Sequence, residues 1–399
     1  MALQPVVQSN AAGTIEQTGG GNGRRRGPPQ RDHHREPKKL PKCFDYGETL
    51  RQRWTIKHEL GHGGFGYIYL AYDRKINQDV AVKAAVRNRE KDNARMYIEY
   101  KIIERGSELK LKNFVQFFGC GEEPVDCPRI NFIVMQLVSR NLTDCRRKQP
   151  SNCLTRATSL RTAYQATEAL RDLHNQIGYI HRDIKPSNMA FGADDQHKRV
   201  MYLFDFGLAR CWIDKTTNQP LAQRPGHVGF RGTARYASIR CNHRQDQCRA
   251  DDMVSVFFGT LELMNGSLPW RTMKDDDIGP AKEQFTSSEA KYVKLCGKAP
   301  PLFREVGKYL MSLNFSSDPN YQYVLDSINQ SLSELGVSHH SALDWEMDHA
   351  LPDDPPPPPP NIQYAPPQQQ DRHGPTIDAK DPYKDPSTGL VISHELYKQ

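Results

Sequence analysis

We predict from the sequence an α+β protein with two lobes, a small antiparallel β lobe that carries one helix and a larger lobe that is mainly helical. Three observations support this prediction. Segments with alternating apolar residues predominate between Trp54 and Val138. Apolar stripes at helical spacing predominate after Asn141. Between those stripes lies a polar run, His181–Asn188, followed by Asp205–Gly207, which has the composition of a functional loop.

The length and composition of the chain fit one two-lobed domain with polar tails. Of the 399 residues, 37% are hydrophobic, and Gly and Pro number 28 each, so a sizeable core can form while part of the chain stays unfolded. We predict a disordered Gly/Arg-rich arm at 1–50, a first lobe at 51–138, a second lobe at 139–346 and a disordered Pro-rich tail at 347–399.

The two tails carry weaker functional signals. Arg24–Arg26 is suited to nuclear import or nucleic-acid contact, but a solvated basic tail is the favoured interpretation, and we do not expect nucleic-acid binding. Pro355–Pro360 predicts a stiff polyproline segment, for which a spacer is favoured over a ligand for adaptor domains.

Charge and cysteine content narrow the class of protein. The formal net charge is +7, and residues 51–345, between the two tails, carry 42 basic and 33 acidic side chains, a net of +9, which favours acidic or phosphorylated partners through long-range attraction. The nine cysteines are an odd number, Met1–Asn10 lacks the features of a signal peptide, and no apolar run reaches 18 residues. We therefore expect a soluble protein with reduced thiols and no membrane association, located in the cytoplasm, with the nucleus as the alternative.

The first strand pair encloses a glycine-rich turn. Strands are expected at Trp54–Leu60 and Tyr67–Tyr72. Glycines in such a hairpin let the backbone approach a triphosphate, although an ordinary hairpin turn would be the better interpretation of this motif alone. The residues expected to contact a nucleotide here are Leu60, Gly61, Gly63, Gly64, Phe65, Gly66 and Ile68.

The next strand carries a lysine that needs a partner. Asp79–Lys83 is a short apolar strand, and Glu99 falls sixteen residues after Lys83 in a predicted helix at Asp92–Glu104. A lysine that reaches phosphates needs a carboxylate to hold its side chain, so we expect Glu99 to contact Lys83. The alternative is a solvated lysine on an edge strand. Ala81, on the same strand, is expected beside the nucleotide.

Two further strands are predicted at Phe114–Gly119 and Asn131–Val138. The second would place Met135 beside an adenine, with the backbone of Gln136 and Val138 hydrogen-bonded to the edge of the base. Because only backbone groups are needed there, core packing explains Met135 equally well.

The polar run contains groups suited to phosphoryl transfer. Seven residue types at set offsets, namely His, Arg, Asp and Asn of this run and then Asp, Phe and Gly, would occur by chance at a given starting position with odds of roughly 10⁻⁹. The alternative, a charge-rich surface turn near an unrelated Asp-Phe-Gly, is therefore disfavoured. Asp183 would accept the proton of a hydroxyl, and Lys185 would lie over the transferring phosphate. Asn188 and Asp205 would each offer an oxygen to Mg²⁺.

Two helices are expected to support this loop. Leu160, Tyr164, Leu170 and Leu173 form an apolar stripe that leads into it, and Asp251–Met264 is apolar on almost every side, as a buried helix should be. We expect Asp252 to accept hydrogen bonds from the loop backbone. A helix cap is an alternative role compatible with this one.

These motifs, in this order, resemble those of eukaryotic protein kinases over about Trp54 to Trp345. The resemblance implies the two-lobed protein kinase fold and the use of ATP and Mg²⁺. Gly229–Ile239, which stands where most kinases have Ala-Pro-Glu, resembles the casein kinase 1 group. Similarity to its tau-tubulin kinase branch rests on Ser187–Ala190, Leu268–Arg271 and Asp344–Glu346.

The resemblance implies a kinase that phosphorylates Ser or Thr in acidic or already phosphorylated proteins, often without phosphorylation of its own activation segment. Arg235 matches the anion-binding arginine of the group, and Lys282 is expected to contribute. The alternative is that Arg235 ties down its own loop. Thr233 is expected to contact Asp183 and Lys185.

The chain departs from the pattern of this branch at several positions. Tyr67 stands where Glu is usual, Arg240–Asn242 replaces Asn-Ala-His, and Val254–Ser255 replaces Trp-Ser. None of these changes removes a catalytic group, so activity is expected, whereas the substrate preference is open. The alternative function is a non-catalytic scaffold of the same fold that works through its basic surface and Pro-rich tail.

Overall fold

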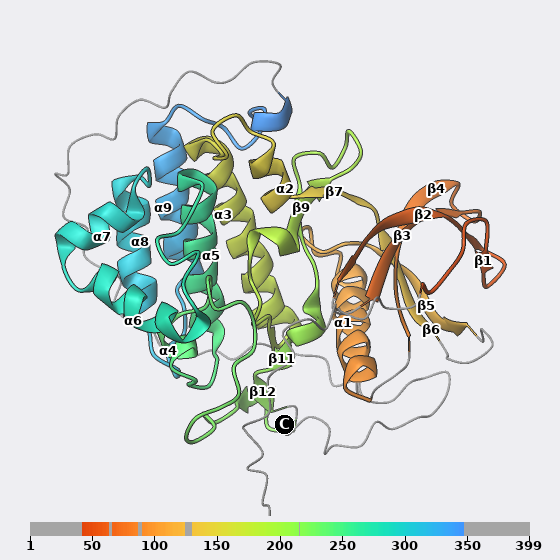
Figure 1. Cartoon of the computed structure of the whole chain (residues 1–399), viewed down its shortest axis with the longest axis horizontal. Helices are drawn as coiled ribbons and strands as arrows, with labels where there is room; N and C mark the ends of the chain where they lie inside the picture. The colour runs from red at the N-terminus through yellow and green to blue at the C-terminus, as the bar shows by residue number, and fades with distance from the viewer. Residues whose placement is uncertain (1–41, 64–65, 87–89, 124–129, 215, 347–399) are drawn as a thin grey trace, which may run out of the picture. The chain divides into compact units, whose positions relative to one another are not determined.

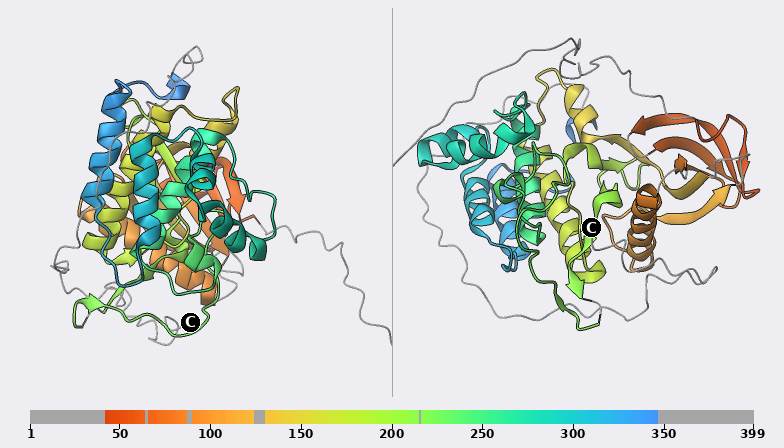
Figure 2. Two further views of the ribbon diagram at one scale, coloured as in Figure 1. Left: turned by 90° about the vertical axis from the view of Figure 1, so that its left-hand side faces the viewer. Right: turned by 60° about the horizontal axis from the view of Figure 1, so that its bottom comes forward.

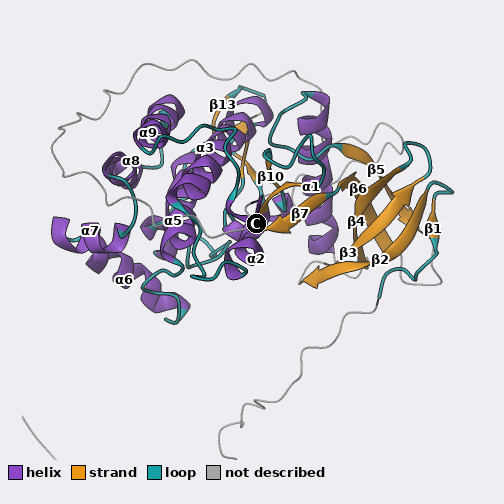
Figure 3. Cartoon of the chain, turned by 90° about the horizontal axis from the view of Figure 1, so that it is seen from above, coloured by secondary structure: helices purple, strands orange, loops and turns teal. Residues whose placement is uncertain are grey.

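A computed structural model of the chain describes residues 42–63, 66–86, 90–123, 130–214 and 216–346. In Figure 1 strands β1 to β6 gather with helix α1, and helices α3 to α9 gather in a second group. The same separation is seen from above in Figure 3. The predicted α+β architecture with a β lobe and a mainly helical lobe is confirmed.

The β lobe is one antiparallel sheet in the order β1-β2-β3-β4-β6-β5. Along β3, buried and half-buried residues alternate, as a period of two requires for a strand with one face on a core. Helix α1 packs against β5 and β6. The bounds of these elements are β1 Thr49–Leu50, β2 Trp54–Gly63, β3 Gly66–Asp73, β4 Gln78–Val86, α1 Glu90–Glu108, β5 Phe117–Glu123 and β6 Ile130–Gln136.

Several predicted boundaries in this lobe differ from the structure, and β2, β3 and β4 are each longer than predicted. The strand expected at Phe114–Gly119 begins only at Phe117, because Phe114 is buried and its ring stacks on Phe206 with centroids 5.6 Å apart. The helix expected at Asp92–Glu104 is longer at both ends. The strand expected to run to Val138 ends at Gln136, and Val138 opens the next strand.

The second lobe is mainly helical and contains three small sheets, in the orders β10-β9-β7, β11-β8 and β12-β13. Its helices are α2 Leu142–Arg147, α3 Arg156–Asp172, α4 Ile239–Asn242, α5 Arg249–Asn265, α6 Asp275–Thr286, α7 Glu289–Cys296, α8 Pro301–Ser312 and α9 Tyr321–Glu334. Its strands are β7 Val138–Asn141, β8 Tyr179–Ile180, β9 Met189–Gly192, β10 Met201–Leu203, β11 Arg210–Cys211, β12 Ile213–Asp214 and β13 Gln219–Pro220.

Helix α5 lies at the centre of this lobe. Every residue from Ala250 to Met264 is buried, which confirms the apolar helix that the sequence predicts. Helix α3 packs against α5 and α9, and α5 also contacts α8 (Figure 2). After α3, a π-helical turn at Leu173–Ile177 ends at Gly178, which has a φ of +83°, and the chain then enters β8. The polar run therefore begins directly after the buried strand β8, Tyr179–Ile180.

The last described residues fold back onto the helical lobe. The Asp344 carboxylate accepts hydrogen bonds from the Thr155 backbone N–H (2.7 Å) and hydroxyl (2.6 Å), and the Trp345 ring packs on Phe191. The predictions for Arg24–Arg26 and Pro355–Pro360 fall outside the described residues. Within the described part of the chain, none of the helices combines the length and apolar character needed to cross a bilayer.

Candidate active site

The backbone of the polar run is held by a buried carboxylate at the start of α5. Asp252 Oδ1 accepts from the Arg182 N–H (2.8 Å), and Asp252 Oδ2 accepts from the His181 N–H (2.6 Å) and from His174 Nε2 (3.0 Å). Burial alone would raise the pKa of Asp252, but these donors lower it on balance. The predicted contact is confirmed, and the capping role belongs to Asp251, which accepts from the Cys248 N–H.

Two residues of the site adopt a backbone conformation that is uncommon outside glycine. Arg182 has a φ of +69° and Asp205 a φ of +66°. Such conformations cost free energy and persist where surrounding contacts fix them, commonly at functional sites. The Arg182 side chain supplies one such contact, because its Nε donates to the Leu208 carbonyl at 2.6 Å. This bond links the polar run to the segment after Asp205.

Asp183 is the centre of a three-residue cluster. Lys185 Nζ donates to Asp183 Oδ2 at 2.6 Å, and the Thr233 hydroxyl donates to Asp183 Oδ1 at 2.7 Å. Lys185 Nζ also lies 3.3 Å from the Thr233 hydroxyl. The contacts predicted for Thr233 are therefore present. Gly232 permits them, since it has a φ of +105° and a Cβ there would collide with the Arg182 carbonyl.

A second cluster forms where the two lobes meet. Lys83 Nζ, on β4, donates to both Glu99 oxygens on α1 (2.6 and 2.7 Å) and to Asp205 Oδ1 (3.0 Å). Burial alone would lower the pKa of Lys83, but the two carboxylates raise it on balance, so the side chain stays an ammonium. Lys83 is thus a paired, buried lysine and not a solvated one.

The predicted metal ligands have the right chemistry for Mg²⁺. Asn188 Nδ2 donates to the Asp183 carbonyl at 2.9 Å, which leaves its amide oxygen as the atom available to a cation. Lys83 lowers the pKa of Asp205 against the opposing effect of burial, so this carboxyl is ionised, and 23% of its side chain is exposed. A carboxylate and an amide oxygen are hard donors of the kind that Mg²⁺ takes, so the residues present fit this ion.

The glycine-rich turn joins β2 and β3, in which Gly63 is paired with Gly66. Gly66 has a φ of +128°, and a Cβ there would collide with the Ala84 carbonyl, so the turn requires glycine at this position. Leu60 is exposed and Gly61 half-buried, whereas Gly64 and Phe65 lie outside the described residues.

The other residues expected at the nucleotide lie on neighbouring strands. Ile68 on β3 is paired with Lys83 on β4, and Ala81 on β4 is paired with Met135 on β6. The Gln136 N–H donates to the Gln116 carbonyl at 2.8 Å, so this N–H is used within the protein. Contact of the Gln136 and Val138 backbone with an adenine stays a prediction. Val138 follows as the first residue of β7.

The expectation that Lys282 contributes to an anion site is wrong. Lys282 is 0% exposed, and its Nζ donates to the Ala234 carbonyl (2.8 Å), the Ala237 carbonyl (2.5 Å) and Asn242 Oδ1 (3.0 Å). Burial lowers its pKa to about 7. Its amino group is therefore used inside the protein, where it holds the chain that follows Thr233.

Arg235 is placed differently. Its Nη1 lies 3.4 Å from Glu262 Oε1, and about a third of its side chain is exposed. The contact with Glu262 shows that Arg235 ties down its own loop, as the alternative interpretation held. Binding of a substrate anion by the exposed part of the side chain stays a prediction.

Sequence reasoning missed a buried acid among the basic residues that follow Thr233. Asp246 is buried and contacts Arg210 and Arg224. The signal was an acidic residue within a basic stretch, but nothing in the spacing indicates that arginines twenty and more residues earlier meet there.

Comparison with known proteins agrees with this geometry. The profile of the protein kinase domain family matches residues 54–326. A Dictyostelium discoideum protein named as a probable serine/threonine-protein kinase is 34% identical over 306 residues, or 76% of this chain and 58% of that protein. A Caenorhabditis elegans protein assigned provisionally to casein kinase I is 36% identical over 230 residues, or 57% and 65% of the two chains. The Caenorhabditis elegans serine/threonine-protein kinase spe-6 is 28% identical over 303 residues, or 75% and 77%.

The chain spans less than two thirds of the length of the first two of these relatives. The family match itself extends over more than half of the chain and includes both clusters of the site. The chain belongs to the protein kinase family.

Proposed function

We propose that this chain is a Ser/Thr protein kinase that transfers the γ-phosphoryl group of ATP to hydroxyls of protein substrates, with Mg²⁺. One observation carries the proposal: Lys83 Nζ lies within 3.0 Å of carboxylate oxygens of Glu99 and Asp205, while Asp183 and Lys185 of the polar run form a second cluster with Thr233. Phosphoryl transfer needs positioning and charge neutralisation more than covalent chemistry, and these two clusters supply both.

Within this function Asp183 orients the substrate hydroxyl and accepts its proton. Thr233 and Lys185 fix the two carboxylate oxygens, so the base is held before substrate arrives. Lys185 then balances the negative charge that develops on the transferring group. Lys83, held by Glu99, binds the triphosphate of ATP. Asp205 and Asn188 would hold Mg²⁺, which when bound would supply further neutralisation of the phosphate oxygens.

The finer assignment is to the casein kinase 1 group and its tau-tubulin kinase-like branch, with acidic or phosphorylated substrates. The name of one relative, a protein assigned provisionally to casein kinase I, supports the assignment to the group. The assignment to the branch rests on the motifs Ser187–Ala190, Leu268–Arg271 and Asp344–Glu346. The segment that resembles this group is also anchored by its own side chains. The Tyr236 hydroxyl donates to Glu262 Oε2 and the Ser238 hydroxyl to Asp251 Oδ1. A partly exposed Arg235 beside it is suited to pair with phosphate.

The activity is tested by phosphate transfer from labelled ATP to a library of Ser, Thr and Tyr peptides. Asp183→Asn is expected to lose nearly all transfer, and Asp195→Asn, which removes an exposed carboxylate elsewhere, to keep it. Transfer to Ser and Thr but not to Tyr is expected. Equal incorporation by the native protein and Asp183→Asn would contradict the proposal and favour the scaffold function.

Substrate preference is tested with matched Ser peptides that carry phosphoserine, aspartate or alanine upstream. Arg235→Gln is expected to lower kcat/KM for the phosphorylated peptide about tenfold and for the alanine peptide little. Arg147→Gln is the matched control, because Arg147 makes an exposed ion pair of the same length, 3.4 Å, with Asp144. Equal effects of Arg235→Gln on all peptides would contradict the assignment to Arg235.

A further inference from the structure

Asp246 is a fully buried carboxylate bonded to two arginines that lie far from it in sequence. Arg210 Nη1 donates to Asp246 Oδ1 at 2.7 Å, and Arg224 donates to it through Nη2 at 2.8 Å and Nε at 3.2 Å. The Arg224 backbone N–H donates to Asp246 Oδ2 at 3.0 Å. Burial would raise the pKa of Asp246, but these arginines hold it at about 2. The group is an anion under all ordinary conditions.

The two arginines belong to the activation segment, which we define as residues 205–239. Arg210 lies on β11 near the start of the segment, and Arg224 lies beyond β13 in its middle part. Asp246, in contrast, lies outside the segment, between α4 and α5. A single carboxylate therefore fastens two separate points of the segment to the helical lobe.

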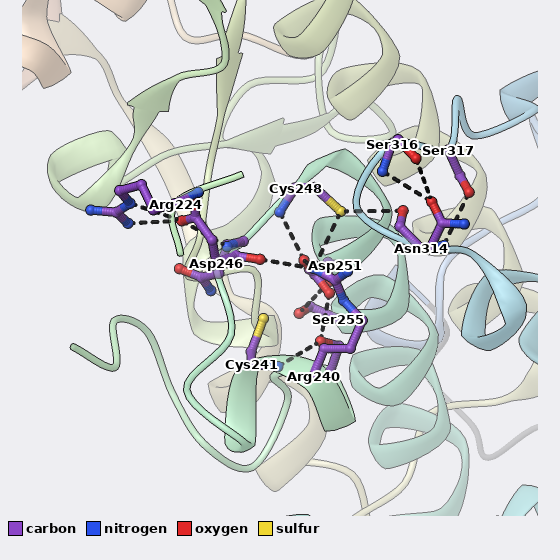
Figure 4. Close-up of polar contacts among 12 residues, drawn as sticks. Arg224, Arg240, Cys241, Asp246, Cys248, Asp251, Ser255, Asn314, Ser316 and Ser317 are labelled. Carbon is purple, nitrogen blue, oxygen red and sulfur yellow. Dashed lines mark hydrogen bonds and ion pairs between the residues drawn. The ribbon is translucent and has the colours of Figure 1, made fainter. Parts of the chain in front are cut away.

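The backbone of Asp246 is also held in place, by the side chain of Arg240 (Figure 4). Arg240 Nη2 donates to the Asp246 carbonyl at 2.8 Å and pairs with Asp251 Oδ2 at 3.2 Å. Asp251 in turn caps α5, the buried central helix.

The surroundings of Asp246 are strongly cationic. Burial lowers the pKa of Arg182 to about 10, and Arg210, Arg224 and Arg231 contribute to the shift. Arg182 precedes Asp183 directly, so repulsion among these arginines would act on the residue next to the base. Asp246 is the carboxylate that pairs with Arg210 and Arg224 at this point.

We propose that Asp246 is a positioning residue whose carboxylate is a built-in counter-ion for Arg210 and Arg224. By neutralising them it holds the activation segment in the arrangement in which Thr233 meets Asp183, without a phosphate on the segment. This inference rests on the proposed kinase function for its catalytic consequence. Its structural consequence, an ordered activation segment, is measured separately.

The catalytic test uses the full chain after phosphatase treatment. Asp246→Asn keeps the shape of the side chain and removes its charge, and it is expected to lower kcat at least about tenfold, since misplacement by about 1 Å can cost 10²-fold. The KM for ATP is expected to change less than twofold, because Lys83, Glu99 and Asp205 are not in contact with Asp246. Asp246→Glu is expected to restore part of the activity. Asp276→Asn, which breaks an exposed pair with Arg244, is the matched control and is expected to be neutral.

Two readouts separate positioning from general damage. Hydrogen exchange of peptides from 205–239 is expected to speed up in Asp246→Asn and not in Asp276→Asn, while exchange in α5 stays the same. Millimolar sulfate is expected to raise the activity of Asp246→Asn and not that of the native protein, because the anion can pair with the two released arginines.

If Asp246→Asn does not fold, the double variant Arg210→Gln with Arg224→Gln carries the same expectation for kcat and exchange, since both side chains reach the surface. A kcat within twofold of native together with unchanged exchange in the segment would overturn the proposal. Equal losses in Asp246→Asn and Asp276→Asn would also overturn it. If the native chain transfers no phosphate, the proposed function fails, and the exchange result still decides the role of Asp246.

Discussion

Replacing Asp252 with Asn is expected to damage both stability and catalysis, because this side chain joins the polar run to the central helix. Asp252 is 2% exposed and accepts from three donors, the N–H groups of His181 and Arg182 and the ring of His174. An amide has one oxygen and one NH₂ group. Whichever way it is turned, the NH₂ group faces a buried donor, so at least one bond is lost and one donor is left unpaired.

The size of the effect follows from these contacts. A hydrogen bond to a charged group contributes about 1.5–3 kcal/mol, and a buried unpaired donor costs about 1–3 kcal/mol. We therefore expect Asp252→Asn to lower the free energy of unfolding by about 3–5 kcal/mol. For a domain of this size that corresponds to a drop in Tm of at least about 5 °C. Displacement of Asp183 by about 1 Å would lower kcat about 10²-fold.

Urea unfolding and thermal melting measure the first effect, and kcat at saturating ATP measures the second. Asp195→Asn, an exposed carboxylate, is the control and is expected to change stability by less than about 0.5 kcal/mol. A loss below about 1 kcal/mol with kcat within twofold of native would refute the reasoning about Asp252.

The same substitution has a defined pH dependence. Because the pKa of Asp252 is lower in the folded state than in the unfolded chain, where it is about 3.9, its stabilising contribution is complete above that value. The contribution is lost as the pH falls through the folded-state pKa. The stability difference between native protein and Asp252→Asn is thus expected to be constant near neutral pH and to shrink below about pH 4. A difference that stays constant to acid pH would contradict this.

Three further predictions concern single side chains. Thr233→Ala is expected to lower kcat about tenfold at unchanged KM for ATP, while Thr233→Ser keeps the hydroxyl on Asp183 and most of the activity; steady-state kinetics of the pair decides this. Gly232→Ala is expected to lower kcat while the fold is kept, because a Cβ there collides with the Arg182 carbonyl at the site itself. A kcat equal to that of the native protein would exclude the collision. Burial lowers the pKa of Lys282 to about 7, so above pH 7 the unfolded chain binds more protons at this residue than the folded protein does. Lys282 therefore makes the free energy of unfolding rise with pH up to about pH 10.4, by at most about 1.4 kcal/mol per pH unit. Urea unfolding at several pH values is expected to show that slope difference between the native protein and Lys282→Met, and parallel curves would contradict it.

Much of the site was predictable because its chemistry lies in short, ordered motifs. The need of Lys83 for a carboxylate, together with the position of Glu99 in the following helix, indicated that the two residues meet, and both Glu99 oxygens do contact Lys83. The contact of Asp252 with the polar run was also predicted, because a buried helix that begins with an acid offers its carboxylate to nearby N–H groups. Local pattern and a polar group's need for partners were sufficient in these cases.

Other features were decided only by packing between distant segments. Phe114 looked like the start of a strand, but its ring stacks on Phe206, 92 residues later, and the strand begins at Phe117. Lys282 looked like a surface cation, but α6 directs it to three oxygens in the core. Neither outcome has a local signal, because burial of a side chain depends on what the rest of the chain places around it.

The sequence by itself determined the order of strands and helices, the reactive groups and their expected partners within each motif. Tertiary structure decided which charged side chains are paired inside the protein and which remain accessible to a substrate. Asp246 shows the difference, because its two arginine partners precede it by 36 and 22 residues and no periodicity links them. The physical reason is that hydrogen bonds within a motif follow local geometry, whereas ion pairing in a core follows from which surfaces meet when the lobe closes on α5.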